Sequence, residues 1–170
     1  MRRRRPLRVV IADDHRLLPE AVRALLEPSA DIEVVGVTYE LDGIDALVAE
    51  LQPDLLLLDS DMPGMDGLGY LDRLRHAHPT VAVVLLTESA DAALATAALA
   101  RGVRGVIVKG SDPDALAPAL RAAIRREAPR RENPMVFARR REPKEGIAAR
   151  LDALRALVDR AIFGHDYDWL

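Results

Sequence analysis

The sequence predicts an α/β fold in which a parallel sheet carries helices on both faces. Short apolar, β-branched segments alternate five times with segments of helical periodicity. The apolar segments are nearly continuous, which is typical of strands that are buried on both sides. With 49% hydrophobic residues in a chain of 170, there is enough apolar surface for one ordinary core and a short additional element.

Five strands are expected from the apolar segments: Leu7–Ala12, Ile32–Val37, Asp54–Leu58, Val81–Thr87 and Gly105–Val108. Between them, hydrophobic residues recur every three or four positions, which predicts helices. These stripes run from Leu17 to Leu26, Leu41 to Leu51, Leu68 to Leu74, Ala90 to Ala100 and Leu116 to Ile124.

Several residues predict where these elements begin and end. Pro53 and Pro79 separate helices from the strands that follow, because proline interrupts a helix. Gly102 stands where a helix end favours a left-handed residue. Asp112 can cap a helix whose first residue is Pro113.

Charge and proline content divide the chain into five parts. We expect a basic N-terminal tail at 1–6, a main domain at 7–127, an Arg- and Pro-rich linker at 128–146, an amphipathic helix at 147–163 and a tail at 164–170. Hydrophobic residues of 147–163 fall on one helical face, which would dock on the main domain or on a second copy of the chain.

Composition excludes several classes of function. Residues 7–127 carry 11 basic and 20 acidic side chains, a charge that disfavours nucleic acid as a partner. The absence of cysteine excludes disulfides, thiolate zinc sites and cysteine catalysis. Val81–Leu86 is the longest apolar run and is too short to span a membrane. No export segment follows the basic start, so we expect a cytoplasmic protein without membrane contact.

Polar residues follow four of the predicted strands. Asp13 and Asp14 come after the first strand, Asp59 ends the third, Thr87 the fourth and Lys109 the fifth. In an open parallel sheet, ligands bind at the carboxyl ends of the strands, so these side chains should converge there. Crowded carboxylates repel one another unless a cation lies among them, and Mg²⁺ prefers such oxygen ligands.

The same group of side chains favours phosphoryl chemistry. Mg²⁺ commonly accompanies phosphoryl groups, and a hydroxyl at Thr87 with an ammonium at Lys109 could contact phosphate oxygens. Asp59, on a central strand, is the candidate acceptor, since aspartyl phosphates are known covalent intermediates. We interpret His15 as a polar residue at a helix start rather than as a base, and His76, His78 and His165 as surface groups.

Residues from Leu7 to about Ile124 resemble a response-regulator receiver domain of bacterial two-component signalling. The segments VVIADDHRLL, PDLLLLDSDMPGMDG, VAVVLLT and ARGVRGVIVKG carry the resemblance, in order and at the family's spacing. The DDH start and the MPGMDG turn are most similar to the NarL/FixJ branch. The resemblance implies a flavodoxin-like (βα)5 doubly wound sheet with strand order 2-1-3-4-5.

The resemblance also implies a Mg²⁺ site and a phosphoryl switch. Asp59 matches the phosphoacceptor and a metal ligand, Asp14 a direct ligand, Asp13 a ligand that acts mainly through water, and Asp61 a ligand through its backbone carbonyl. Thr87 matches the hydroxyl that moves to the phosphate, and Lys109 the lysine that binds it. The implied partners are a histidine kinase as donor and an output protein or a second copy, with no enzymatic activity beyond self-phosphorylation and self-dephosphorylation.

Some residues depart from the family pattern. Val106 replaces an aromatic switch residue, Glu88 and Asp61 add carboxylates beside the site, and Gly110 replaces a common proline. Added negative charge should disfavour phosphorylation. An alternative function is therefore a phosphorylation-independent receiver that acts as a constitutive interaction or dimerisation module.

The C-terminal part also departs from the family. The 43 residues after Glu127 hold one predicted helix, whereas a helix-turn-helix output domain needs about four. We expect a regulator without that domain. The weaker alternative is a transcription regulator, truncated or contacting DNA through its basic tail.

Overall fold

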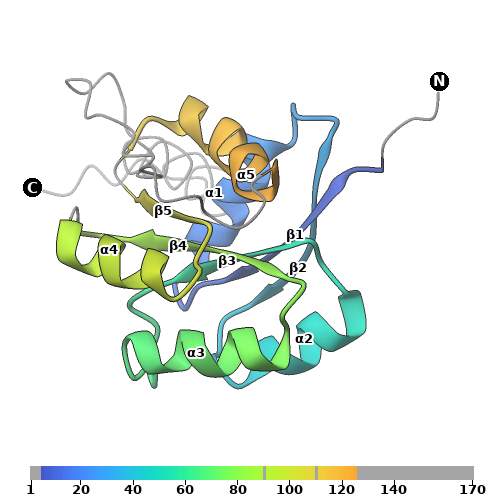
Figure 1. Cartoon of the computed structure of the whole chain (residues 1–170). Helices are drawn as coiled ribbons and strands as arrows, with labels where there is room; N and C mark the ends of the chain where they lie inside the picture. The colour runs from blue at the N-terminus through green and yellow to red at the C-terminus, as the bar shows by residue number, and fades with distance from the viewer. Residues whose placement is uncertain (1–4, 90, 110, 126–170) are drawn as a thin grey trace, which may run out of the picture.

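The computed structural model describes residues 5–89, 91–109 and 111–125. The predicted linker at 128–146, the predicted helix at 147–163 and the predicted tail at 164–170 lie outside these residues, as do Gly110 and most of the basic N-terminal tail. Within them, strands and helices alternate along the chain, as the periodicity predicts (Figure 1).

Five parallel strands form one sheet in the order β2-β1-β3-β4-β5, which confirms the doubly wound topology. Their bounds are β1 Leu7–Ala12, β2 Ile32–Thr38, β3 Leu55–Asp59, β4 Ala82–Thr87 and β5 Gly105–Val108. Asp54 was predicted to begin the third strand but precedes it. Its carboxylate accepts hydrogen bonds from the Arg8 backbone and the Arg5 guanidinium, which holds it in the turn.

The helices are α1 Leu17–Leu26, α2 Gly43–Leu51, α3 Leu68–Ala77, α4 Ala92–Ala100 and α5 Leu116–Arg125, the last preceded by a 3₁₀ turn at Pro113–Ala115. Helix α4 begins two residues later than predicted because Asp91 caps it, accepting a hydrogen bond of 2.8 Å from the Ala93 backbone. Gly102 has a φ of 83°, and Asp112 caps the turn that begins at Pro113, both as predicted.

The sheet is covered on both faces. Helices α1 and α5 pack on one face, against a cluster that includes Val9, Leu57 and Val84 (Figure 1). Helices α2, α3 and α4 pack on the other. All five residues of β3 are buried, which explains its run of four leucines and places Asp59 in the middle of the sheet's carboxyl edge. In the described part of the chain, no helix is long and apolar enough to cross a membrane.

Candidate functional site

Two aspartates are fully buried at the carboxyl edge of the sheet. Asp13 follows β1, and its backbone N–H donates to the Thr38 carbonyl on the neighbouring strand, 3.1 Å away. Asp59 is the last residue of β3. Its Oδ1 accepts a hydrogen bond of 3.0 Å from the Asp61 backbone. Fully buried carboxylates are rare unless they are paired or bind a cation, so this placement indicates a functional role.

Lys109 brings a positive charge between these carboxylates. Its Nζ donates a hydrogen bond of 2.8 Å to Asp59 Oδ2 and lies 3.3 Å from Asp13 Oδ2. Its backbone N–H donates to the Thr87 carbonyl on β4, 2.8 Å away, which extends the parallel pairing of β5 past its last residue. The lysine side chain is only 7% exposed, so this ion pair is shielded from water.

Burial and the proximity of Asp13 to Asp59 shift the pKa values of the ionisable groups in this site. Burial raises the pKa of the Asp13 carboxyl, and the nearby Asp59 charge adds to the increase. Burial by itself would lower the pKa of Lys109, but the hydrogen bond to Asp59 and the charge of Asp13 outweigh it and raise that pKa. Lys109 therefore stays protonated at neutral pH and balances part of the negative charge.

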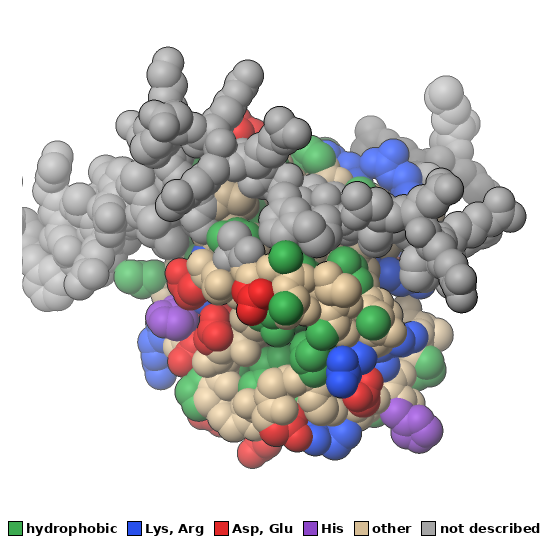
Figure 2. All heavy atoms as spheres, turned by 60° about the vertical axis from the view of Figure 1, so that its left-hand side comes forward, with side chains coloured by type: hydrophobic (Ala, Val, Ile, Leu, Met, Phe, Trp, Pro, Cys, Tyr) green, Lys and Arg blue, Asp and Glu red, His purple; other side chains and the backbone are tan. Residues whose placement is uncertain are grey.

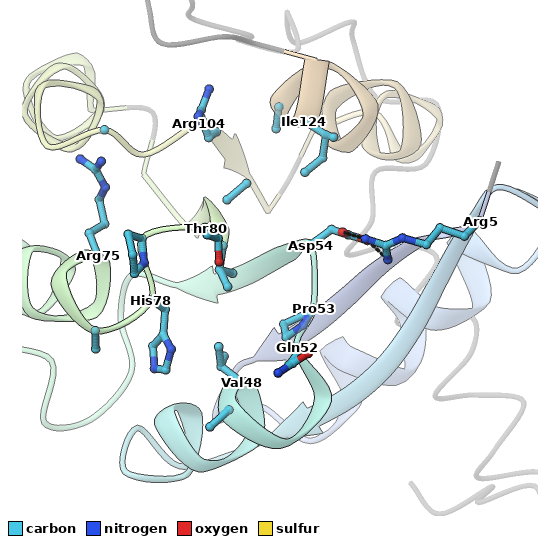
Figure 3. A pocket seen from close by; sticks show the side chains of 17 residues that line it. Arg5, Val48, Gln52, Pro53, Asp54, Arg75, His78, Thr80, Arg104 and Ile124 are labelled. Atoms are coloured by element: carbon cyan, nitrogen blue, oxygen red, sulfur yellow. Dashed lines mark hydrogen bonds and ion pairs between the residues drawn. The ribbon is translucent and has the colours of Figure 1, made fainter.

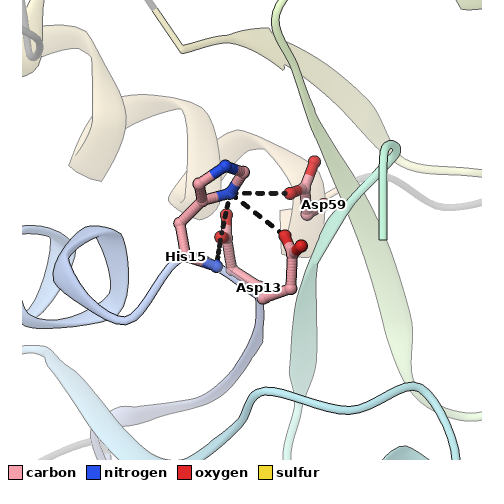
Figure 4. Close-up of side chains that lie close together, drawn as sticks. Asp13, His15 and Asp59 are labelled. Atoms are coloured by element: carbon pink, nitrogen blue, oxygen red, sulfur yellow. Dashed lines mark hydrogen bonds and ion pairs between the residues drawn. The ribbon is translucent and has the colours of Figure 1, made fainter. Parts of the chain in front are cut away.

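Asp14 and His15 complete a cluster with the buried acids. His15 Nδ1 lies 3.1 Å from Asp13 Oδ1, 3.0 Å from Asp14 Oδ1 and 3.7 Å from Asp59 Oδ2. Figure 4 shows the imidazole pointing toward Asp13 and Asp59. The sequence does not predict this contact. The available signal was the position of His15 directly after two aspartates, but the direction of its side chain depends on the loop before α1.

The residues of this cluster fit a divalent cation. Ligand atoms of Asp13, Asp14, His15 and Asp59 all lie within 4.8 Å of one another. Asp13 Oδ2 and Asp14 Oδ1 are buried atoms that accept no hydrogen bond of good geometry from the described residues, although Lys109 Nζ lies 3.3 Å from the first and His15 Nδ1 lies 3.0 Å from the second. Carboxylate oxygens with coordination left to fill are the ligands that a hard cation takes.

The other predicted site residues lie around this cluster. Thr87 is the last residue of β4 and is buried, and its hydroxyl accepts a hydrogen bond of 3.2 Å from the Ser89 backbone. Glu88 is 71% exposed, and its Oε1 lies 3.8 Å from Lys109 Nζ. Asp61 is exposed and touches Asp59 through its backbone N–H. The sheet thus brings together the predicted residues of all four strand ends.

A pocket of about 890 Å³ lies at the opposite edge of the sheet, where β3, β4 and β5 begin. Figure 3 shows Arg75, His78 and Arg104 around it and the ion pair between Arg5 and Asp54 at one side. None of the clustered acids lines this pocket. The cluster of Asp13, Asp59 and Lys109 therefore lies at the edge of the sheet opposite this pocket.

Fold and site together define a doubly wound α/β domain with a buried acidic cluster and a lysine at the carboxyl edge of its sheet. A family model of the response regulator receiver domain matches residues 9–121. The chain belongs to this family, as the resemblance found in its sequence implies.

Individual relatives support this classification. The chain is 34% identical over 162 residues to the nitrate/nitrite response regulator protein NarL of Escherichia coli K12, covering 95% of this chain and 71% of that protein. The signal receiver domain of the putative response regulator NarL from Mycobacterium tuberculosis superposes with a TM-score of 0.64 at 31% identity, covering 72% of this chain and all of that one.

The family also includes relatives that are enzymes. A protein-glutamate methylesterase/protein-glutamine glutaminase of Myxococcus xanthus is 42% identical over 115 residues, which cover 66% of this chain and 32% of that protein. The similarity thus spans only about a third of that protein's length.

Proposed function

We propose that this chain is a two-component response regulator that accepts a phosphoryl group on Asp59 in a Mg²⁺-dependent reaction. The observation that carries the proposal is the fully buried Asp59 carboxylate, held 2.8 Å from the Lys109 ammonium and beside the acids that follow β1. We expect a histidine kinase as the phosphodonor and a reaction in the cytoplasm. The activity is self-phosphorylation and self-dephosphorylation, without an outside substrate.

The transfer needs a positioned nucleophile and compensation of negative charge. An oxygen of the Asp59 carboxylate attacks the phosphorus of a phosphohistidine. The new O–P bond forms as the P–N bond breaks, and the electron pair leaves with the imidazole nitrogen, which takes up a proton from solvent. The backbone N–H of Asp61 holds the Asp59 carboxylate in place, and Lys109 pairs with the phosphoryl oxygens.

A bound Mg²⁺ would neutralise charge on the phosphoryl oxygens during transfer. Asp14 and Asp59 would hold it directly, Asp13 through water, and Asp61 through its backbone carbonyl. The acceptor atoms of Asp13 and Asp14 that lack hydrogen bonds support this assignment.

Phosphorylation would be transmitted through the end of β4. The Thr87 hydroxyl accepts a hydrogen bond from the Ser89 backbone and would reorient toward the phosphoryl group, moving the loop that leads to α4. The surface over α4 suits a protein partner or a second copy, because Ala92–Ala100 contains no charged residue. Figure 2, in which the α4 side comes forward, shows hydrophobic side chains gathered in the middle of this face.

A second function is favoured by two observations at the same site. Glu88 places a carboxylate 3.8 Å from Lys109 Nζ, where it repels an incoming phosphoryl group. Val106 is half-buried on β5 and has no ring to move between two positions. Both support a receiver that binds its partner constitutively, without phosphorylation.

The test is the mass of the intact protein after incubation with Mg²⁺ and acetyl phosphate, and in parallel with histidine kinases. We expect one added phosphoryl group in the parent protein and in the control Asp72→Asn, whose carboxylate lies on the exposed side of α3. Asp59→Asn should remain unmodified and folded. Labelling of Asp59→Asn would overturn the assignment of Asp59, and no labelling from any donor would favour the constitutive module.

A further inference from the structure

The imidazole of His15 has no part in the phosphoryl transfer described above. It is nevertheless the one nitrogen ligand in the described acidic cluster, and Nδ1 is the atom that faces the carboxylates (Figure 4). Its side chain is 63% exposed, so its direction does not result from burial in the core.

The spacing of these atoms suits ligands of one cation. Two ligands bound at right angles, each about 2.1 Å from the ion, are about 3.0 Å apart. His15 Nδ1 lies 3.0 Å from Asp14 Oδ1, which is assigned above as a direct ligand, and 3.7 Å from Asp59 Oδ2. Its 3.1 Å contact with Asp13 Oδ1 joins it to the acid that would act through water. Asp14 Oδ1 accepts no hydrogen bond of good geometry from the described residues, although the imidazole nitrogen lies 3.0 Å away.

We propose that His15 Nδ1 is a ligand of the cation and that it makes the site prefer a first-row transition-metal dication over Mg²⁺. Carboxylate oxygens suit both kinds of ion, whereas an imidazole nitrogen favours the transition metals. The inference rests on the proposed function only in requiring a cation among the carboxylates. It concerns which ion binds there.

The same geometry permits a simpler role for His15, in which Nδ1–H donates to Asp13 Oδ1. That hydrogen bond would orient Asp13, and the cation would then be bound through oxygen alone. A ring nitrogen that donates a proton has no lone pair to offer, so the two roles are exclusive and can be distinguished by experiment.

The direct test is electron spin-echo spectroscopy of Mn²⁺ bound to the whole chain at pH 8. We expect nitrogen modulation in the parent, a change of that modulation when the histidine rings carry ¹⁵N, and its loss in His15→Asn. His76→Asn, a matched change at an exposed position of α3, should keep it. Mn²⁺ bound without nitrogen modulation, or no bound Mn²⁺, overturns the proposal.

Competition between Co²⁺ and Mg²⁺ tests the selectivity. We expect His15→Asn to lower the Co²⁺/Mg²⁺ affinity ratio by about tenfold, with His76→Asn unchanged. An equal ratio in the parent and His15→Asn overturns the proposal. A parent protein that binds Mn²⁺ through nitrogen but takes no phosphoryl group would refute the proposed function and leave this inference standing. A parent protein that is phosphorylated but binds Mn²⁺ through oxygen alone would support the proposed function and refute this inference.

Discussion

Lys109 Nζ lies 2.8 Å from Asp59 Oδ2, although fifty positions separate the two residues in the chain. Both side chains are buried, and the same ammonium lies 3.3 Å from Asp13 Oδ2. The lysine therefore compensates two buried carboxylates at once. Its removal would leave both carboxylates without a compensating charge in a poorly solvated site. The protein should then be less stable and gain more from a bound cation.

Lys109→Met should lower the free energy of unfolding by about 3 kcal/mol at pH 7 without divalent cations, because breaking a buried ion pair leaves unpaired charge. MgCl₂ should restore more stability to this variant than to the parent, since the cation replaces the lost ammonium. Urea unfolding with and without MgCl₂ measures both effects. Arg73→Met, which removes an exposed pair with Asp66, should change stability far less. A Lys109→Met protein as stable as the parent would contradict this account.

The stability of Asp13→Asn relative to the parent should rise with pH. Burial raises the pKa of Asp13 in the folded protein above 3.8, the ordinary value that applies to the unfolded chain. At a pH between the unfolded-state and folded-state pKa values, the native protein binds a proton that the unfolded chain has released. The parent therefore loses stability with rising pH through this window, and an amide does not. Unfolding of both proteins in EDTA from pH 4 to pH 8 tests the prediction.

The control variant for that experiment is Asp31→Asn, whose stability relative to the parent should change with pH in the opposite direction. The hydrogen bond from Arg121 holds the pKa of Asp31 below 3.8, so its contribution is present above pH 3.8 and is lost as the pH falls through the lower folded-state value. Asp31→Asn should therefore destabilise the protein at pH 7 and have less effect under acidic conditions. A pH-independent difference for Asp13→Asn would show that Asp13 does not titrate as described.

Glu88→Ala should accelerate phosphoryl uptake from acetyl phosphate by about two- to fivefold, which corresponds to removing roughly 0.5–1 kcal/mol of repulsion at an exposed position. The added phosphoryl group measured over time gives the rate. Glu50→Ala, an exposed glutamate at the far end of α2, is the matched control. An unchanged or slower rate in Glu88→Ala would show that Glu88 does not repel the phosphoryl group.

Leu57→Ala should lower the free energy of unfolding by about 3 kcal/mol, because it leaves a cavity in the central strand, where Leu57 is fully buried. Leu17→Ala makes the same chemical change at the start of α1, where the side chain is 49% exposed, and should cost well under about 1 kcal/mol. Chemical denaturation of the two variants compares them directly, and equal losses would contradict the burial of β3.

Much of this protein could be predicted before its structure was known. Near-continuous apolar strands and the helical stripes between them predicted the α/β fold, because each pattern reflects locally which faces are buried. The strand order came from the resemblance to receiver domains and is confirmed by the sheet. Asp59 stood out because an acid directly after four buried leucines requires a partner.

The particular contacts of the site were decided by tertiary structure alone. The hydrogen bond between Lys109 and Asp59 exists because strand order and register bring the ends of β3 and β5 to one edge of the sheet. His15 faces the carboxylates because of the conformation of the loop before α1. The local sequence pattern indicates which residues of each helix or strand are buried. It does not give the distances between side chains on different elements, because those distances depend on how the elements pack.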